Sequence, residues 1–193
     1  MTLCGLNRIY YPVTSLGFGS RLGVWFQGCA RHCAGCMSPE MQPFSRDPVP
    51  MEDVLSRIPG DIRPDGMTVS GGEPFDQSAA LRLLVSWFLS AHTSDILVYT
   101  GYTLEALRER NDADTDWVLS HIAALADGEY EQENNPGTGL VGSSNQRLHV
   151  FSHHARYLDF TRCQRRMQCI DERGQLFLIG IPPGSTDEKQ SLL

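Results

Sequence analysis

The sequence lacks the features that would place the protein in a membrane or on a nucleic acid. No stretch of its 193 residues reaches the roughly 18 apolar residues that a membrane-spanning helix needs. The first residues do not pair a basic segment with an apolar one, as a secretory signal peptide would. A formal net charge of -7 gives no general attraction to nucleic acid or anionic lipid. We therefore expect a cytoplasmic protein with neither partner.

Internal repeats and low-complexity segments are also missing, and the composition is that of an ordinary globular protein. Hydrophobic residues make up 41% of the chain and charged residues 20%, which fits one domain at this length. The chain has six cysteines, and three of them, Cys29, Cys33 and Cys36, lie close together in the sequence. Without an export signal, this clustering favours metal binding or redox chemistry over disulfide bonds.

Strand and helix patterns alternate along the chain. The spacing of apolar residues predicts strands at residues 21–27, 67–70, 95–100, 121–126, 147–151 and 175–180, and helices at 51–58, 78–91, 104–110 and 116–119. Residues 131–146 are rich in Gly, Asn, Ser and Pro and predict a long functional loop. Such alternation implies a mostly parallel sheet, with ligand sites beyond the carboxyl ends of its strands. The polar motifs follow predicted strands, so one site can collect them.

The three clustered cysteines supply three thiolates on one tight loop. Thiolates of this kind hold iron–sulfur clusters. A [4Fe–4S] cluster bound by three cysteines keeps one iron open for a substrate or cofactor, which is a catalytic arrangement. Zinc is the competing interpretation, since it also prefers thiolates and would need only a fourth ligand such as His32, Cys4 or Cys169. The spacing alone leaves both open.

Residues 71–74, Gly-Gly-Glu-Pro, form the second candidate motif. Paired glycines let the backbone approach a ligand closely, and Pro74 stiffens the turn. Glu73 is a suitable acceptor for a cation such as an ammonium group. The alternative for Glu73 is a structural role, in which it caps a neighbouring turn.

Together the cysteine spacing and the Gly-Gly-Glu-Pro motif resemble the radical S-adenosylmethionine superfamily. Within it, the chain is similar to the activating enzymes of anaerobic ribonucleotide reductase over roughly residues 7–148. Phe18 stands where these enzymes usually have Pro, and residues 73–75 read Glu-Pro-Phe in place of Asp-Pro-Leu. The matching segments are Gly17-Phe-Gly-Ser-Arg21, Trp25-Phe-Gln-Gly-Cys29, Cys33-Ala-Gly-Cys36, Pro39-Glu40, Thr100-Gly-Tyr-Thr103, Asp127-Gly128 and Gly142-Ser-Ser-Asn-Gln-Arg147.

The resemblance implies a partial (β/α) barrel, a mostly parallel sheet and two cofactors, a [4Fe–4S] cluster and S-adenosylmethionine. It implies reductive cleavage of S-adenosylmethionine to a 5′-deoxyadenosyl radical, which installs a glycyl radical on a partner such as anaerobic ribonucleoside-triphosphate reductase. Flavodoxin or ferredoxin would donate the electron. Cys29, Cys33 and Cys36 would hold the cluster. The implied cofactor-binding residues are Gly35, Met37, Gly71, Gly72, Glu73, Pro74, Thr100, Gly101, Tyr102, Ser143, Ser144, Asn145 and Gln146.

A C-terminal extension distinguishes this chain from a minimal activating enzyme. We expect a core at residues 1–150 and an extension at 151–193 that packs on it, with a frayed tail at 182–193. Cys163 and Cys169 are too isolated to indicate a second metal centre, so we interpret them as structural or incidental thiols. His153 and His154 are interpreted likewise. Two other functions stay open: a radical enzyme that modifies a small molecule, nucleotide or peptide, and a non-catalytic metal-binding module.

Overall fold

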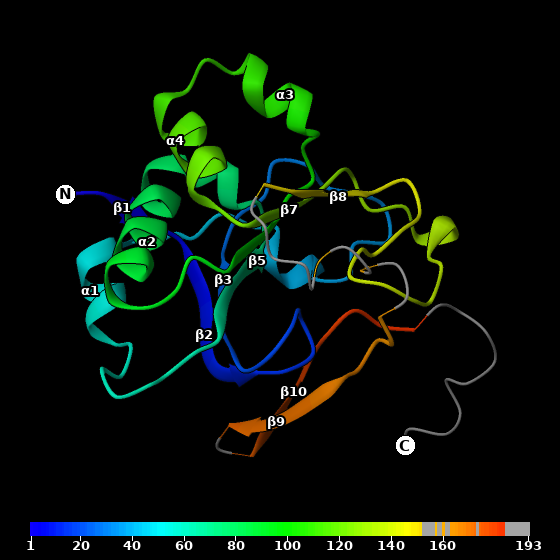
Figure 1. Cartoon of the computed structure of the whole chain (residues 1–193), viewed down its shortest axis with the longest axis horizontal. Helices are drawn as coiled ribbons and strands as arrows, with labels where there is room; N and C mark the ends of the chain where they lie inside the picture. The colour runs from blue at the N-terminus through cyan, green and yellow to red at the C-terminus, as the bar shows by residue number, and fades with distance from the viewer. Residues whose placement is uncertain (152–156, 158–159, 161–162, 173, 184–193) are drawn as a thin grey trace.

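The computed structural model describes residues 1–151, 157, 160, 163–172 and 174–183. His153, His154 and most of the tail predicted at 182–193 lie outside the described residues. The described part is a mixed α/β fold, in which helices lie to one side of a central sheet and a separate β-hairpin lies apart from these helices (Figure 1). No helix in this part is both long and apolar enough to cross a bilayer.

The central sheet is mostly parallel, as the sequence predicts. Its inner strands pair in parallel, whereas the two outer strands, β2 and β8, run antiparallel to their neighbours. A parallel centre follows from helical crossovers between strands that are buried on both faces. In spatial order the strands are β2 (Leu6–Val13), β3 (Arg21–Phe26), β5 (Gly66–Gly71), β6 (Ile96–Tyr99), β7 (Ala124–Asp127) and β8 (Arg147–Val150).

Helices cover one face of this sheet and form the main core with it. The apolar residues Leu81, Leu84, Val85 and Phe88 of helix α2 recur at helical spacing, so one stripe of the helix is buried. Each such side chain stabilises the fold by about 1.5–3 kcal/mol through burial of apolar surface. The helices are α1 (Met51–Ser56), α2 (Ser78–Ala91), α3 (Leu104–Glu109) and α4 (Ala113–His121).

Part of the opposite face is covered by the C-terminal hairpin, formed by β9 (Gln168–Glu172) and β10 (Gln175–Ile179). Side chains alternate along a strand, so Trp25 points away from the helices that its neighbours Val24 and Phe26 contact. Trp25 packs instead in a second apolar cluster, together with Ile170 and Ile179 of the hairpin. The hairpin therefore gives the sheet a second layer on this side.

Several predicted elements were wrong in extent or missing. The strand predicted at 121–126 begins only at Ala124, because α4 runs on to His121. That helix also begins before the predicted 116, since the Asp112 side chain caps it by accepting a hydrogen bond from the Asp114 N–H at 3.2 Å. Strands β2 and β9 were not predicted, and neither was the short pair β1 (Leu3–Cys4) and β4 (Val49–Pro50).

A buried ion pair lies at the amino ends of the strands. Arg21, the first residue of β3, is 0% exposed, and its guanidinium lies 3.1 Å from the Asp95 carboxylate. Arg21 Nε also donates to Thr68 Oγ1 at 2.6 Å, and the Tyr157 hydroxyl donates to Asp95 at 2.6 Å. Gly17 has φ +114°, and a Cβ there would lie 2.7 Å from the Arg21 side chain. The segment from Gly17 to Arg21 therefore has a structural role, and it lies at the end of β3 opposite to the cysteines.

Candidate functional site

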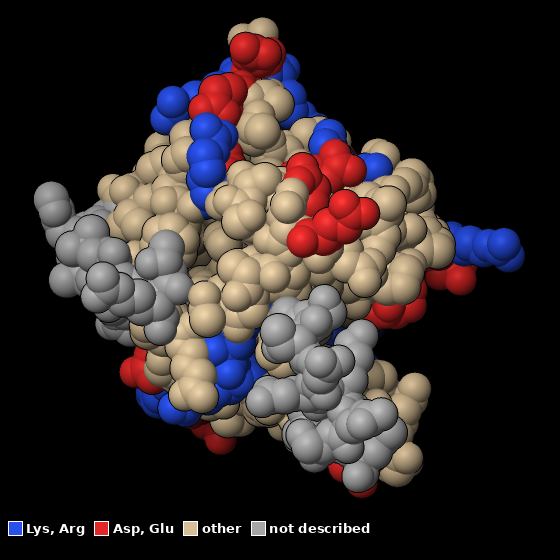
Figure 2. Space-filling view, turned by 90° about the vertical axis from the view of Figure 1, so that its right-hand side faces the viewer, with Lys and Arg blue, Asp and Glu red and all other residues tan. Residues whose placement is uncertain are grey.

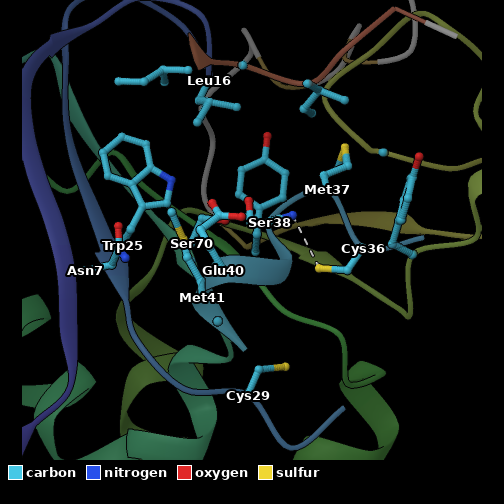
Figure 3. Close-up of a pocket in the computed structure, with 18 of the residues that line it drawn as sticks. Asn7, Leu16, Trp25, Cys29, Cys36, Met37, Ser38, Glu40, Met41 and Ser70 are labelled. Carbon is cyan, nitrogen blue, oxygen red and sulfur yellow. Dashed lines mark hydrogen bonds between the residues drawn. The ribbon is translucent and has the colours of Figure 1, made fainter. Parts of the chain in front are cut away.

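A cavity of about 750 Å³ lies at the carboxyl ends of β3, β5 and β6 and extends over the sheet face that carries Trp25. Figure 3 shows Cys36 and Met37 on one side of it and Trp25 on the other. The predicted site residues that line it are Cys29, Cys33, Cys36, Met37, Gly71, Gly72, Glu73, Thr100, Gly101 and Gln146. Gly35, Pro74, Tyr102, Ser143, Ser144 and Asn145 are not among its lining residues.

The cysteine loop is closed by backbone hydrogen bonds at its base. Gly28 N–H donates to the Met41 carbonyl at 2.8 Å, and Cys29 N–H donates to the Gln42 carbonyl at 2.9 Å. The chain returns through the short 3-10 helix η1 (Pro39–Met41). Within the loop, the Ser38 N–H donates to Cys36 Sγ at 3.4 Å, as drawn in Figure 3. Amide donors to sulfur suit a thiolate, because they stabilise its charge.

The donor set fits a cluster better than a single zinc ion. Among the described residues, no group of three His, Cys, Asp or Glu side chains is arranged to hold one metal ion. Two of the three proposed fourth zinc ligands are also badly placed: Cys4 is buried with its Sγ 3.6 Å from Met51 Sδ, and Cys169 is exposed on β9. Cys29, Cys33 and Cys36 line one cavity without converging on a single point. This arrangement suits a cluster, because a cluster is larger than one ion and each of its irons takes its own ligand. Burial raises the pKa of Cys29, so its thiolate needs the charge of the bound metal.

Glu73 joins the second and third motifs by hydrogen bonds. Its Oε1 accepts from the Phe75 N–H at 3.0 Å and from Thr100 Oγ1 at 2.9 Å, and its Oε2 accepts from the Gly101 N–H at 2.7 Å. Through Phe75 it caps the 3-10 helix η2 (Pro74–Gln77), which is the structural role considered above. Burial raises its pKa to about 7, despite these three donors. Its role toward an ammonium group stays a prediction.

Stability is therefore expected to vary with pH through Glu73. Its pKa is about 7 in the folded protein against an ordinary value of 4.5, so between these values the folded protein retains a proton that the unfolded chain has lost. Its contribution to the free energy of unfolding is present below the lower value and is lost as pH rises to about 7. One such shift amounts to about 3 kcal/mol. The Glu73→Gln variant should lose this dependence.

Urea unfolding of both proteins at about pH 5 and about pH 8 tests this expectation. The quantity compared is the change in the free energy of unfolding between the two pH values, because the substitution also changes the stability at any one pH. Parallel pH profiles for the two proteins would contradict the assignment to Glu73.

Asp76 is a site residue that the sequence did not reveal. Its Oδ2 accepts from the Ala30 N–H at 2.9 Å, and its Oδ1 accepts from the Tyr102 hydroxyl at 2.7 Å. The Arg31 guanidinium lies 4.9 Å from the Tyr102 ring centroid and 3.1 Å from the Glu129 carboxylate. Asp76 therefore attaches the cysteine loop to the segments that follow β5 and β6. Tyr102 acts as part of this attachment and does not line the cavity.

The side chains of the Gly-Ser-Ser-Asn-Gln segment mainly hold the loop itself. Gln146 Oε1 accepts from the Gly142 N–H at 2.7 Å, and its Nε2 donates to the Gly128 carbonyl at 2.7 Å. Ser143 is buried and accepts from the Glu131 N–H, whereas Asn145 donates to the Glu129 carbonyl. Gly142 and Gln146 are the members of this segment that reach the cavity. Figure 2 shows the side of the molecule to the right in Figure 1, where most of the described surface is uncharged and both acidic and basic residues form small groups.

Comparison with known proteins agrees with this geometry. Residues 15–149 match the family described as a 4Fe-4S single cluster domain. The anaerobic ribonucleoside-triphosphate reductase-activating protein of Vibrio cholerae serotype O1 is 31% identical over 153 residues, covering 74% of this chain and 96% of that protein. The protein of the same name from Enterobacteria phage T4 is 29% identical over 152 residues, covering 74% and 91%.

The chain belongs to the family of 4Fe-4S single cluster domains. Within that class it is a radical S-adenosylmethionine enzyme related to the activating proteins. Its cofactors are a [4Fe–4S] cluster and S-adenosylmethionine, as the sequence predicts. The family match contains all three clustered cysteines and ends before the C-terminal hairpin.

Proposed function

We propose that this enzyme cleaves S-adenosylmethionine reductively and installs a glycyl radical on an anaerobic ribonucleoside-triphosphate reductase. The two relatives are named as activating proteins of such a reductase. The observation that carries the proposal is that one cavity is lined by the cysteine loop, by Gly71 to Glu73 and by Thr100 and Gly101. A cluster and an amino-acid-like ligand can therefore lie side by side.

The chemistry requires one electron from outside, for which we propose flavodoxin or ferredoxin. That electron would break the sulfonium carbon–sulfur bond of S-adenosylmethionine, giving methionine and a 5′-deoxyadenosyl radical. The radical would take hydrogen from a glycine Cα and leave 5′-deoxyadenosine and the glycyl radical. Cys29, Cys33 and Cys36 would hold three irons of the cluster, and its fourth iron would be free to bind the cofactor. Gly71 and Gly72 let the backbone approach the ligand. Trp25, 8% exposed, and Leu16, 6% exposed, give this part of the cavity an apolar lining.

A radical enzyme that acts on a small molecule is the second candidate. A sealed cavity would favour it, because a protein segment could not reach the cluster. Leu176 and Leu178 line the cavity, yet they are 69% and 70% exposed, so this part of the wall faces solvent. The partly open cavity thus favours a polypeptide substrate.

We further propose that the central sheet is the partial barrel of the superfamily, which the parallel strands β3, β5, β6 and β7 support.

The experiment is anaerobic reconstitution with iron and sulfide, reduction, and chromatography of the products formed from S-adenosylmethionine. We expect 5′-deoxyadenosine, and a glycyl radical signal in electron paramagnetic resonance once the reductase of the same organism is added. Samples without reductant, or without reconstituted cluster, should give neither. An intact reduced cluster that yields no 5′-deoxyadenosine would overturn the proposal.

A further inference from the structure

The cavity has a second wall, which the cofactor motifs do not supply. Met167 and residues 175–182 line it, and all of them come from the C-terminal extension. The cysteine loop and residues 71–73 and 100–101 form the side expected to hold the cofactors. A substrate has to occupy the space that the cofactors leave, so it will contact the remaining walls.

This second wall is firmly attached to the core. The Gln168 side chain donates to the Pro12 carbonyl at 2.9 Å, and the Ser15 hydroxyl donates to the Ile179 carbonyl at 2.8 Å. Arg165 bridges the two ends of the hairpin to the loop beside the site, since it donates to the carbonyls of Val141 and Pro182, each at 2.6 Å. Its geometry is therefore set by contacts with the core, as expected for a surface that selects a substrate.

The chemical character of the wall is apolar and nearly uncharged. Arg8 and Arg31 are the only Lys or Arg residues among the described residues that line the cavity. Arg8 lies over the Phe177 ring at 3.3 Å, and Arg31 is paired with Glu129. Phosphate groups of a nucleotide need several free cationic or N–H donors. The wall instead suits a neutral polypeptide segment.

The wall is also an addition to the part of the chain that is shared with the relatives. The family match ends at residue 149. The relatives align over 96% and 91% of their own lengths, yet over only 74% of this chain. The hairpin therefore lies outside the part of the chain that matches the family.

We infer that β10 is a specificity-determining surface, on which Leu176 and Leu178 contact the polypeptide segment that carries the target glycine. The inference rests on the proposed function, because a glycine in a partner protein is the substrate there. Leu176 and Leu178 lie on the outer side of β10, since side chains alternate along a strand and Phe177 and Ile179 pack toward Trp25. Both leucines border the cavity. Large apolar side chains exposed beside a cavity are typical of a binding surface.

The test compares the dissociation constant for the reductase between wild type and the double variant Leu176→Asp, Leu178→Asp. These positions are exposed, so the variant should fold, and circular dichroism with bound-iron content checks this. We expect binding at least about tenfold weaker, since a buried aspartate is costly at an apolar contact. The Michaelis constant for the reductase should rise in parallel. The conservative double variant Leu176→Met, Leu178→Met should bind as wild type does.

Leu83→Asp is the matched control, because Leu83 is 36% exposed on α2 and does not line the cavity. Unchanged binding by the double aspartate variant would overturn the inference, as would equal weakening by Leu83→Asp. The proposed function fails separately, if wild type gives no 5′-deoxyadenosine in the absence of the reductase.

Discussion

Replacing any one of Cys29, Cys33 or Cys36 by serine should remove the iron–sulfur cluster, and with it all cleavage of S-adenosylmethionine. We expect bound iron and sulfide to fall at least about tenfold after anaerobic reconstitution. The reason is that the other described cysteines, Cys4, Cys163 and Cys169, do not line the cavity. Cys4 is buried against Met51 in the helical core, Cys163 packs against an apolar cluster that contains Leu140 and Tyr157, and Cys169 lies on the hairpin.

Cys169→Ser is the control for this prediction, since it removes a thiol of the same chain without touching the cysteine loop. It should retain full iron and sulfide content. The visible absorption of the cluster gives a second measurement besides activity. Retention of a complete cluster by a loop variant would contradict the ligand assignment, and would direct attention to the cysteines outside the loop.

Arg21→Met should destabilise the folded protein by about 3–5 kcal/mol, because it removes the guanidinium from a buried ion pair with the Asp95 carboxylate. The Arg21 and Asp95 side chains are 0% and 2% exposed, so this pair is shielded from water. Methionine fills much of the space of the arginine side chain. The loss is therefore mainly electrostatic and not a cavity effect.

Denaturant unfolding of the cluster-free protein under anaerobic conditions measures this loss. The control is Arg82→Met, which removes a surface ion pair with Asp114 whose side chains are 42% and 31% exposed. A surface pair of this kind contributes at most about 1 kcal/mol. If the two variants lost similar amounts of unfolding free energy, the buried Arg21–Asp95 pair would contribute no more to stability than the surface pair, and the prediction would be wrong.

The parallel centre of the fold and the gathering of its motifs could be predicted from sequence because both depend on local patterns. The buried strand at residues 21–27 and the helix at 78–91 carry apolar residues at the spacing of their own element. Parallel neighbours then bring their carboxyl ends to one edge. The cysteines and the Gly-Gly-Glu segment are therefore found in one cavity.

What the sequence could not predict depends on contacts between distant residues. Strand β2 contains Pro12, which is tolerated because β2 is an edge strand, and edge position is not a local property. Asp76 follows a recognisable motif, but its partners Ala30 and Tyr102 lie 46 and 26 residues away. Similarly, Asp127 belongs to a matched segment, and the structure shows that it accepts from the Leu104 N–H at the start of α3 at 2.7 Å.

The attachment of the hairpin has a consequence for how enzymes of this kind can diverge. Several of its hydrogen bonds to the core run from side chains to main-chain carbonyls, as for Gln168 to Pro12 and Arg165 to Val141. A carbonyl is present whatever side chain its residue carries, so these attachments do not depend on the side-chain identity of the acceptor residues. The outer residues of β10 can therefore be exchanged while the cluster end of the cavity stays the same. A single radical-generating core could in this way be redirected to new protein partners by grafting another hairpin.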